Sequence, residues 1–541
     1  MKQVRGNFVD IYSKSIYPAT VIVEENSIVE IRKENQNYSN YIIPGFVDSH
    51  VHIESSMLVP VEFSRMAVQH GTVATVSDPH EIANVLGLDG VRFMIENGQH
   101  AALKFFWGIP SCVPATTFET SGAVLSVHDM DTLVKYREVV AMAEMMNFPG
   151  VVYDDPGVHD KLLFAKGNKI PVDGHAPGLS GESLTKYIAA GISTDHECST
   201  MEGALEKLQQ GMKILIRNGS SAKNFEALAS LVDLYPKQVM FCCDDIHPDD
   251  LLKGHINRFL KWGVERGLNL FHLLKASGFN AVQHYNLPVG MLRVGDKGDF
   301  CVVSDLKDFK VVETWIDGEC VFSEFASKES EPVAVVPVNR FNVSPLSVLD
   351  IRVSNQHSSF KAIGVIDGEL LTKNLQIENT QTGEFLSSDT SHDVLKIVVV
   401  NRYSGGTPSV AFIKGFGLKQ GAIASTVAHD SHNIISVGVD DEQIVAAINL
   451  LIENKGGIAV VNCDEQLVLP LPVAGLMSLD SGVMVASMYE KLHAKAKANG
   501  SPLTAPFMTL SFMALLVIPE LKLSDKGLFD SNHFQFTSLF V

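Results

Sequence analysis

Short apolar segments recur along the first half of the chain, and each is followed by a helical or loop segment. Apolar segments that alternate with helical patterns are typical of parallel sheets built from strand–helix units. Eight such units in about 250 residues predict a (β/α)8 barrel of the TIM type, an α/β fold. A doubly wound open sheet would also alternate, but no Gly-x-Gly-x-x-Gly motif follows the first segment. The eight predicted strands span residues 42–47, 71–77, 104–110, 139–145, 169–173, 191–195, 212–217 and 238–243.

Ionisable residues stand directly after most of the predicted strands. In a barrel these positions share the C-terminal face, where active sites are built. His50 and His52 are two residues apart and would point to the same side of a strand. A His-x-His pair alone could simply be hydrogen-bonded at a strand end. A metal site is predicted because histidines and carboxylates follow strand after strand: His50 and His52, Asp78-Pro79-His80-Glu81, Glu144, Asp173-Gly174-His175, Asp195-His196-Glu197 and Asp244-Asp245. Arg217-Asn218-Gly219 follows the seventh predicted strand.

Composition narrows the class of protein. A chain of 541 residues with 46% apolar residues is too long for one core and should form two or three units. A net charge of −19 argues against nucleic acid as a partner. The seven cysteines have no regular spacing and do not predict a disulfide framework. The apolar stretch 507–518 is shorter than a membrane span requires, and no basic-then-apolar leader precedes residue 40. We therefore expect a cytoplasmic protein without a membrane anchor.

Strand-like patterns flank the predicted barrel on both sides. Residues 1–40 alternate apolar and polar positions, and a matching pattern returns at 298–303 and 311–321, where Asp317-Gly318 is a hairpin signal. We therefore predict a small β-sandwich-like domain from residues 1–43 together with 290–335. The catalytic barrel would span 44–289, and residues 340–541 would form a C-terminal α+β domain.

Several stretches resemble the amidohydrolase superfamily and, within it, the adenine deaminase family. The resemblance covers nearly the whole chain, and the matches after the barrel distinguish this family from other amidohydrolases. It lies in PGFVDSHVHIESS (44–56), DPHEIANVLG (78–87), AEMMNFPGV (143–151), DGHAPGLSG (173–181), TDHE (194–197), IRNGSSAKN (216–224), CCDDIHP (242–248), KGFGLKQGAIASTVAHDSHNI (414–434) and LPLPVAGLMS (469–478).

The resemblance implies a binuclear divalent metal centre. Many relatives bridge their metals with a carboxylated lysine on the fourth strand, but here Glu144 stands in that position and is the implied bridge. Imidazole with carboxylate suits manganese, iron or zinc. The resemblance favours Mn²⁺, with Fe²⁺ and Zn²⁺ as alternatives. The implied metal ligands are His50, His52, Glu144, His175, His196 and Asp244.

The implied reaction is hydrolysis of adenine to hypoxanthine and ammonia by a metal-activated hydroxide, in purine salvage. Asp244 would be catalytic, because it can accept the proton of the hydroxide and pass it to the purine or the leaving amine. Asp245 and Glu54 would bind substrate, with a structural cap as the alternative for Asp245. The alternative function is another amidohydrolase reaction, either cyclic amide hydrolysis or deamination of a different nucleobase. A metal-holding scaffold without catalysis is a third hypothesis, and we expect a homodimer or higher homo-oligomer.

Some polar residues keep two interpretations. Glu54, His80, Glu81 and Glu197 could orient the purine or a ligand imidazole, or could equally form caps or ion pairs. In His429-Asp430-Ser431-His432, a second metal site would need one more ligand than the segment offers. A hydrogen-bonded loop is the favoured interpretation of this segment.

Overall fold

The computed structural model describes residues 1–220, 222–325 and 335–541. Ser221, inside the motif at 216–224, and residues 326–334, inside the predicted segment 290–335, lie outside the described residues. The chain divides into two compact units. Unit 1 contains residues 1–80, 92–112 and 126–335, and unit 2 contains residues 81–91, 113–125 and 336–541.

A series of parallel strands forms the centre of unit 1. Each of the eight apolar segments overlaps a parallel strand. The first five pair in chain order as parallel neighbours, and the last three form a second parallel sheet. A parallel bridge between Val172 and Ile192 lies at the junction of the two sheets, and β13 (Asp244–Asp245) pairs with the first strand. This is an α/β fold. The strands are β5 (Phe46–His52), β6 (Thr72–Ser77), β7 (Lys104–Ile109), β8 (Val139–Met145), β9 (Val172–Gly174), β10 (Thr194–Asp195), β11 (Lys213–Arg217) and β12 (Val239–Cys242).

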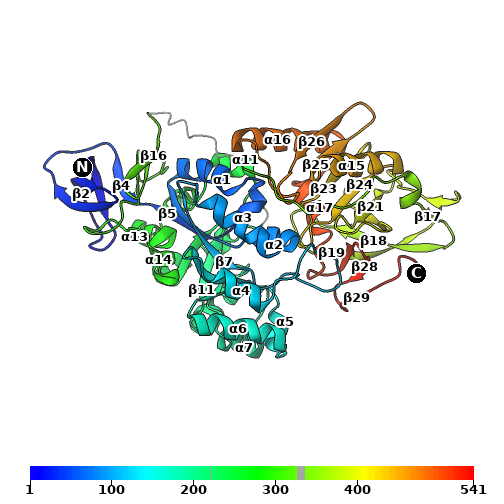
Figure 1. Ribbon diagram of the computed structural model, residues 1–541, viewed down its shortest axis with the longest axis horizontal. Coiled ribbons are helices and arrows are strands. Elements are labelled where there is room, and N and C mark those ends of the chain that lie inside the picture. Colours follow the sequence, from blue (N-terminus) through cyan, green and yellow to red (C-terminus); the bar gives the residue numbers. More distant parts are fainter. Residues whose placement is uncertain (221, 326–334) are drawn as a thin grey trace. The chain divides into compact units, whose positions relative to one another are not determined.

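Helices of unit 1 lie outside these strands, as α1, α6, α7 and α14 do in Figure 1. Side-chain N-caps determine where several of these helices begin. The Asp155 carboxylate accepts the Val158 N–H, and the Thr200 hydroxyl accepts the Gly203 N–H, which satisfies backbone donors in the first turns of α6 and α8. These helices are α1 (Pro60–Ala67), α4 (Val127–Leu133), α5 (Phe148–Val152), α6 (Pro156–Asn168), α7 (Gly181–Ala189), α8 (Met201–Gln209), α9 (Phe225–Leu228), α10 (Leu231–Leu234), α11 (Pro248–Lys253), α12 (Asn257–Glu265), α13 (Leu270–Leu274) and α14 (Asn280–Tyr285).

A third sheet of unit 1 combines strands from both flanks of the parallel strands. Its order is β16-β15-β14-β4-β1-β2-β3, and β14 pairs with β4 so that Phe300 lies opposite Pro44. Asp317 and Gly318 both have positive φ, 47° and 74°. Positive φ at both central residues is what the turn of a tight hairpin requires. The strands are β1 (Lys2–Asp10), β2 (Ser15–Glu24), β3 (Ser27–Lys33), β4 (Tyr41–Pro44), β14 (Phe300–Val303), β15 (Val311–Ile316) and β16 (Glu319–Ser323).

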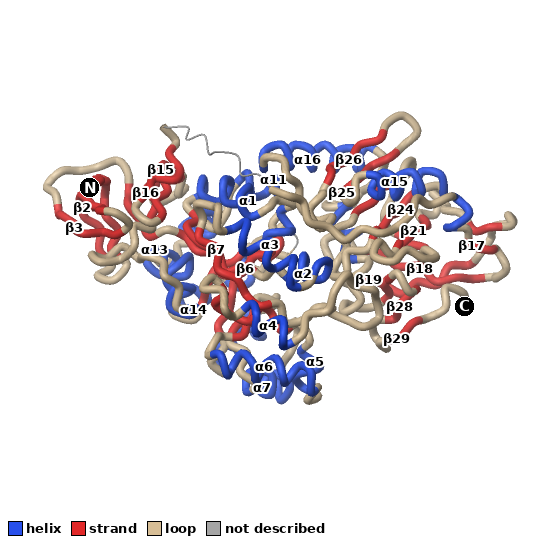
Figure 2. The backbone as a smooth tube through the Cα atoms, in the orientation of Figure 1, coloured by secondary structure: helices blue, strands red, loops and turns tan. Residues whose placement is uncertain are grey.

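Unit 2 is built on an eight-stranded sheet of order β19-β18-β22-β21-β24-β23-β25-β26. Helix α15 (Asp441–Glu453) packs on β23, β24 and β25, and Figure 2 shows α15 and α16 (Gly482–Ala498) beside this sheet. Ile444, Ile448 and Leu451 of α15 share a buried core with Val398 and Val400. The strands are β18 (Ser359–Val365), β19 (Thr372–Glu378), β21 (Val394–Val400), β22 (Ser409–Lys414), β23 (Ala422–Ser425), β24 (Ile434–Gly438), β25 (Gly457–Val461) and β26 (Gln466–Pro470).

Further elements are two helices after β6, and a helix and a small sheet near the C-terminal end of unit 2. Helices α2 (His80–Leu86) and α3 (Leu88–Gly98) follow β6. In unit 2, α17 (Pro506–Phe512) precedes a three-stranded sheet of β27 (Leu521–Ser524), β28 (Gly527–Asp530) and β29 (Gln535–Phe536).

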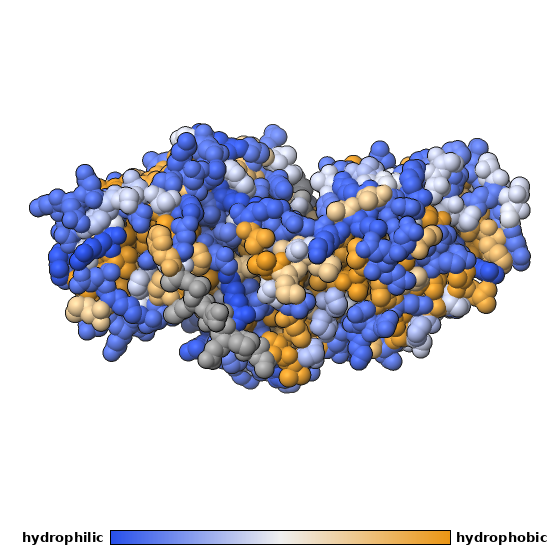
Figure 3. All heavy atoms as spheres, turned by 90° about the horizontal axis from the view of Figure 1, so that it is seen from above, coloured by the Kyte–Doolittle hydropathy of each residue, from blue (hydrophilic) through white to orange (hydrophobic). Residues whose placement is uncertain are grey.

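The surface of the described chain is mixed in character. Figure 3 shows hydrophilic residues over much of the visible face, with smaller hydrophobic areas between them. Among the described residues, no helix has both the length and the apolar character that crossing a bilayer requires.

Candidate metal centre

The six predicted ligands lie together at the ends of the parallel strands. Glu144 contacts three of the others, because its carboxylate is 3.3 Å from His52 Nε2, 2.7 Å from His175 Nδ1 and 3.2 Å from His196 Nε2. Asp244 joins the remaining histidine to this group, since its Oδ1 lies 3.5 Å from His50 Nε2 and 3.2 Å from His52 Nε2. The structure therefore assembles one continuous group of four imidazoles and two carboxylates.

Glu144 comes from the end of β8, whose side chains are almost all buried. Burial alone would raise the pKa of this carboxyl. The adjacent His175, His196 and His52 outweigh burial and hold the pKa of Glu144 well below its ordinary value. The residue is therefore an ionised carboxylate among imidazoles, which is the chemical form a metal bridge requires.

Asp244 follows β12 and has a backbone φ of 59°. This value lies in the left-handed region that non-glycine residues rarely adopt. Such outliers often mark functional positions, because the surrounding structure must hold them. Gly219 lies against this turn, and a Cβ there would sit 2.2 Å from the Asp245 carbonyl oxygen. The close approach of two backbones therefore requires glycine at 219.

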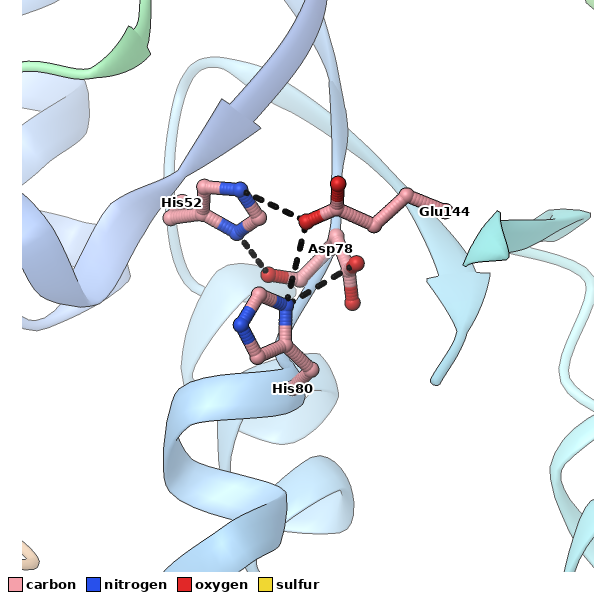
Figure 4. Close-up of side chains that lie close together, drawn as sticks. All are labelled: His52, Asp78, His80 and Glu144. Carbon is pink, nitrogen blue, oxygen red and sulfur yellow. Dashed lines mark hydrogen bonds and ion pairs between the residues drawn. The ribbon is translucent and has the colours of Figure 1, made fainter. Parts of the chain in front are cut away.

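Asp78 and His80 lie near the proposed metal ligands; the sequence left His80 with two interpretations and gave Asp78 no separate role. Figure 4 shows Asp78 and His80 beside His52 and Glu144. The Asp78 carbonyl lies 3.0 Å from His52 Nδ1, and the Asp78 carboxylate lies 3.1 Å from His80 Nδ1. His80 Nδ1 also lies 3.6 Å from Glu144 Oε1. Their signals in the sequence were the position after the second predicted strand and the stretch DPHEIANVLG (78–87).

The contact with Asp78 fixes how His52 can act. With Nδ1–H donated to the Asp78 carbonyl, the lone pair of the neutral ring is on Nε2, which faces Glu144 and Asp244. A backbone carbonyl that orients a histidine in this way is typical of metal sites. His50 Nε2 is buried and has no hydrogen-bond partner in the part of the chain that the structure describes. The donor set therefore fits divalent cations.

Arg217, at the end of β11, was also not assigned from sequence. Its guanidinium group forms a bidentate pair with Glu197, at 2.6 and 2.9 Å, and donates a further hydrogen bond to Asp244. Burial would raise the pKa of Glu197, but Arg217 and the neighbouring histidines lower it well below its ordinary value. Glu197 therefore forms an ion pair here, one of the interpretations that the sequence left open.

The predicted substrate-binding residues lie next to the ligands. Asp245 accepts a hydrogen bond of 2.5 Å from the Ser55 hydroxyl and pairs in β13 with His52 of β5. Glu54 is buried in the short helix η1 (Ile53–Ser56), two residues after His52. The role of both in binding substrate stays a prediction.

The segment 429–432 finds its partner within unit 2. The Glu81 carboxylate lies 2.8 Å from His429 Nδ1 and also contacts His432 Nε2. These groups are close enough to hold a metal ion. However, the Ala428 N–H points at His432 Nδ1, 3.3 Å away. The proton of the neutral ring is therefore on Nε2 and faces Glu81. Burial lowers the pKa of His432 to about 4, and the contacts favour the hydrogen-bonded interpretation.

Comparison with known proteins identifies the family. The model of the amidohydrolase family matches residues 41–321, and the model of the adenine deaminase C-terminal domain matches residues 369–535. The adenine deaminase of Methanosarcina mazei is 50% identical over 556 residues, covering 100% of both chains. This chain belongs to the adenine deaminase family. The family member from Sulfurovum sp. is 52% identical over 535 residues and covers 99% of each chain, and that from Borreliella afzelii is 46% identical with the same coverage.

The solved structures to which this member of the adenine deaminase family is similar are more distant. A β-aspartyl dipeptidase from Fervidobacterium islandicum AW-1 has 16% identity and a TM-score of 0.47, covering 60% of this chain and 98% of that one. A dihydropyrimidinase from Brevibacillus agri NCHU1002 has 12% identity and a TM-score of 0.47, with 60% and 95% covered.

Proposed function

We propose that this chain catalyses the hydrolytic deamination of adenine to hypoxanthine and ammonia. The observation that carries the proposal is the full-length identity of about one half to adenine deaminases, joined to the group of four imidazoles and two carboxylates at the strand ends. An identity that extends over both units is difficult to reconcile with a change of substrate class. It also makes a scaffold that has lost catalysis an unnecessary hypothesis.

The residues suggest a division of labour for this reaction. His50, His52, His175 and His196, with Glu144 and Asp244, would hold two divalent cations, which supply a hydroxide near neutral pH when bound. Asp244 would accept the proton that the nucleophile loses on adding to the ring carbon and return it to the departing amine. Water thus supplies the oxygen of hypoxanthine, and the exocyclic amine leaves as ammonia.

Four residues around the proposed metal ligands would support Asp244 and the purine. The Arg217 guanidinium keeps Asp244 directed at His50 and His52 by occupying its other oxygen. Asp245 and Glu54 would hydrogen-bond the purine, and the Ser55 hydroxyl would orient Asp245. These assignments rest on proximity to the metal ligands.

The finer architecture is also a proposal. We infer that the eight parallel strands close into one (β/α)8 barrel, because the Val172–Ile192 bridge joins the two sheets and β13 pairs with β5. Residues 1–43 with 290–335 would then be the small β domain, 44–289 the barrel and 340–541 the C-terminal α+β domain.

Mn²⁺ is the proposed metal, with Fe²⁺ or Zn²⁺ as alternatives, because imidazole and carboxylate ligands suit all three. A homodimer or larger homo-oligomer and a cytoplasmic location are expectations from the sequence, which light scattering and cell fractionation would test.

The direct test combines metal content with substrate profile on one preparation. Protein loaded separately with Mn²⁺, Fe²⁺ or Zn²⁺ is incubated with adenine, adenosine, guanine, cytosine and dihydropyrimidines, and ammonia and ring-opened products are measured. The expected result is ammonia release from adenine with two metals per chain. Turnover of another compound but not adenine would replace the proposed function with the alternative amidohydrolase reaction.

A further inference from the structure

A buried ion pair lies next to two of the proposed metal ligands. Lys207 of α8 is 2% exposed, and Asp195 of β10 is fully buried. Lys207 Nζ lies 2.8 Å from Asp195 Oδ2. Burial lowers the pKa of the Lys207 ammonium, but Asp195 outweighs burial and the net shift is upward, so the lysine is charged. A charged pair in the protein interior is costly unless further hydrogen bonds satisfy both groups.

The further hydrogen bonds of this pair go to the main chain around the ligands. Asp195 Oδ1 accepts the Ala176 N–H at 2.9 Å, and Lys207 Nζ donates to the Ala176 carbonyl at 2.8 Å. Ala176 directly follows the ligand His175. The pair therefore binds the peptide groups on both sides of one residue, and this fixes the position from which the His175 side chain begins.

The same carboxylate also fixes the second ligand. Asp195 directly precedes His196, and its Oδ2 accepts the Glu197 N–H at 3.2 Å from the other side of that histidine. The Cys198 thiol donates to the same oxygen at 3.1 Å. One carboxylate thus ties together the ends of β9 and β10, which carry His175 and His196.

We propose that Lys207 is a positioning residue that, through Asp195, preorganises His175 and His196 for the divalent cations. The inference rests on the proposed function only in assuming that these imidazoles bind metal. A pair with a purely structural role could hydrogen-bond to any part of the fold. The hydrogen bonds described here for this pair all involve residues within two positions of a proposed ligand. Residues that orient metal ligands typically contribute about 10–100-fold to metal affinity.

The test measures Mn²⁺ affinity by chelator competition on the full-length protein, beside the thermal midpoint of the metal-free form. Lys207→Met keeps the length of the side chain and removes its ammonium. We expect the dissociation constant of Mn²⁺ to rise by about 10–100-fold. The matched control is Lys396→Met in unit 2, because Lys396 is also fully buried, pairs with Asp441 at 2.5 Å and donates to the Ile351 carbonyl at 3.3 Å. The control should lower the thermal midpoint and leave Mn²⁺ affinity unchanged.

A second variant covers the case in which Lys207→Met fails to fold. Asp195→Asn combined with Lys207→Met leaves no uncompensated charge in the interior. It still loses the bond to the Ala176 carbonyl, so its Mn²⁺ affinity should fall as well, and Lys207→Arg should retain more of the wild-type affinity than Lys207→Met. The proposal would be overturned if the double variant Asp195→Asn with Lys207→Met bound Mn²⁺ with wild-type affinity. It would also be overturned if Lys396→Met lost as much Mn²⁺ affinity as Lys207→Met.

Failure of this inference can be separated from failure of the proposed function. A wild-type protein that binds two Mn²⁺ ions but leaves adenine unchanged contradicts the function alone, and the affinity series still decides the role of Lys207. A wild-type protein that binds no divalent cation overturns the positioning role together with its premise.

Discussion

Arg217 and Asp244 form a buried ion pair at the ends of adjacent parallel strands, and the same guanidinium group holds Glu197. Burial would raise the pKa of the Asp244 carboxyl, but Arg217 and the histidines around it outweigh burial and hold this pKa well below its ordinary value. Asp244 is therefore ionised, as both a metal ligand and a proton acceptor must be.

Replacing Arg217 by Met should destabilise unit 1 of the metal-free protein by about 3–5 kcal/mol at pH 7, because two buried carboxylates lose their cation. Their pKa values are depressed in the folded state, so the pair contributes stability above the unfolded pKa of about 4 and loses it as the pH falls further. The loss caused by Arg217→Met should accordingly stay nearly constant from pH 7 to about pH 5 and shrink as the pH falls below about 4.

Tryptophan fluorescence during urea unfolding provides the measurement, because Trp107, Trp262 and Trp315 all belong to unit 1. Arg266→Gln is the control, since Arg266 pairs with the exposed Glu226 at the surface. This control should change stability by less than about 1 kcal/mol. An Arg217→Met variant as stable as the control at pH 7 would show that the pair is not needed.

Glu144→Ala should lose metal and activity together, because it removes the carboxylate that contacts three imidazoles and that would bridge the two proposed cations. Metal per chain is measured after dialysis against a weak chelator. Glu138→Gln is the control, because Glu138 directly precedes the same strand and pairs with the exposed Arg137. Two metals retained at wild-type affinity in Glu144→Ala would exclude Glu144 as the bridge.

Asp244→Asn and Asp245→Asn should differ although the residues are adjacent. Asp244 faces His50 and His52. Its amide variant should lower kcat by about 10²–10⁴-fold, the usual contribution of general acid–base catalysis. Asp245 faces Ser55, so its variant should mainly raise KM for adenine. Steady-state kinetics on metal-loaded protein decide the matter, and exchanged phenotypes would place Asp245 at the reacting atoms.

The periodic pattern of apolar residues located the parallel strands β5 to β12 but missed the two-residue strand β13, and β9 and β10 each begin three residues later than predicted. The fifth was expected at 169–173 and spans Val172–Gly174, since Pro171 just before it has no N–H to donate. The sixth was expected at 191–195 and spans Thr194–Asp195, because Gly191, with φ of 105°, still belongs to the turn after α7.

Local sequence selected the six proposed ligands because each was expected at or just after a strand end, and the structure brings these strand ends together. It could not show which polar side chains pair across the site. Lys207 lies in an amphipathic helix, where a lysine is ordinarily a surface residue. Glu81 meets His429 across 348 residues of chain, a contact that no spacing rule encodes.

Lys522 provides a test of stability in unit 2. Its ammonium is fully buried in β27 and donates to the Leu370 and Phe512 carbonyls, at 2.7 and 3.0 Å. Burial lowers the pKa of Lys522 to about 7 from its ordinary 10.5. The unfolded chain therefore binds more protons than the folded chain between these two pH values, and stability should rise with pH in that window.

The expected contribution is up to about 1.4 kcal/mol per pH unit between about pH 7 and pH 10, because each unit of pKa difference corresponds to that free energy. Lys522→Met should remove this rise in stability. The stability of the wild type relative to the variant should therefore increase as the pH rises from 7 to 9. The stability of unit 2 is measured by calorimetry. All three tryptophans lie in unit 1, so the unfolding of unit 2 is the transition that leaves tryptophan fluorescence unchanged. Lys491→Met, at an exposed position of α16, should leave the pH dependence of the wild type unchanged. If the wild type and Lys522→Met change in parallel with pH, Lys522 keeps its proton over the whole range, and the two carbonyl groups are enough to hold a charged ammonium in the interior of the protein.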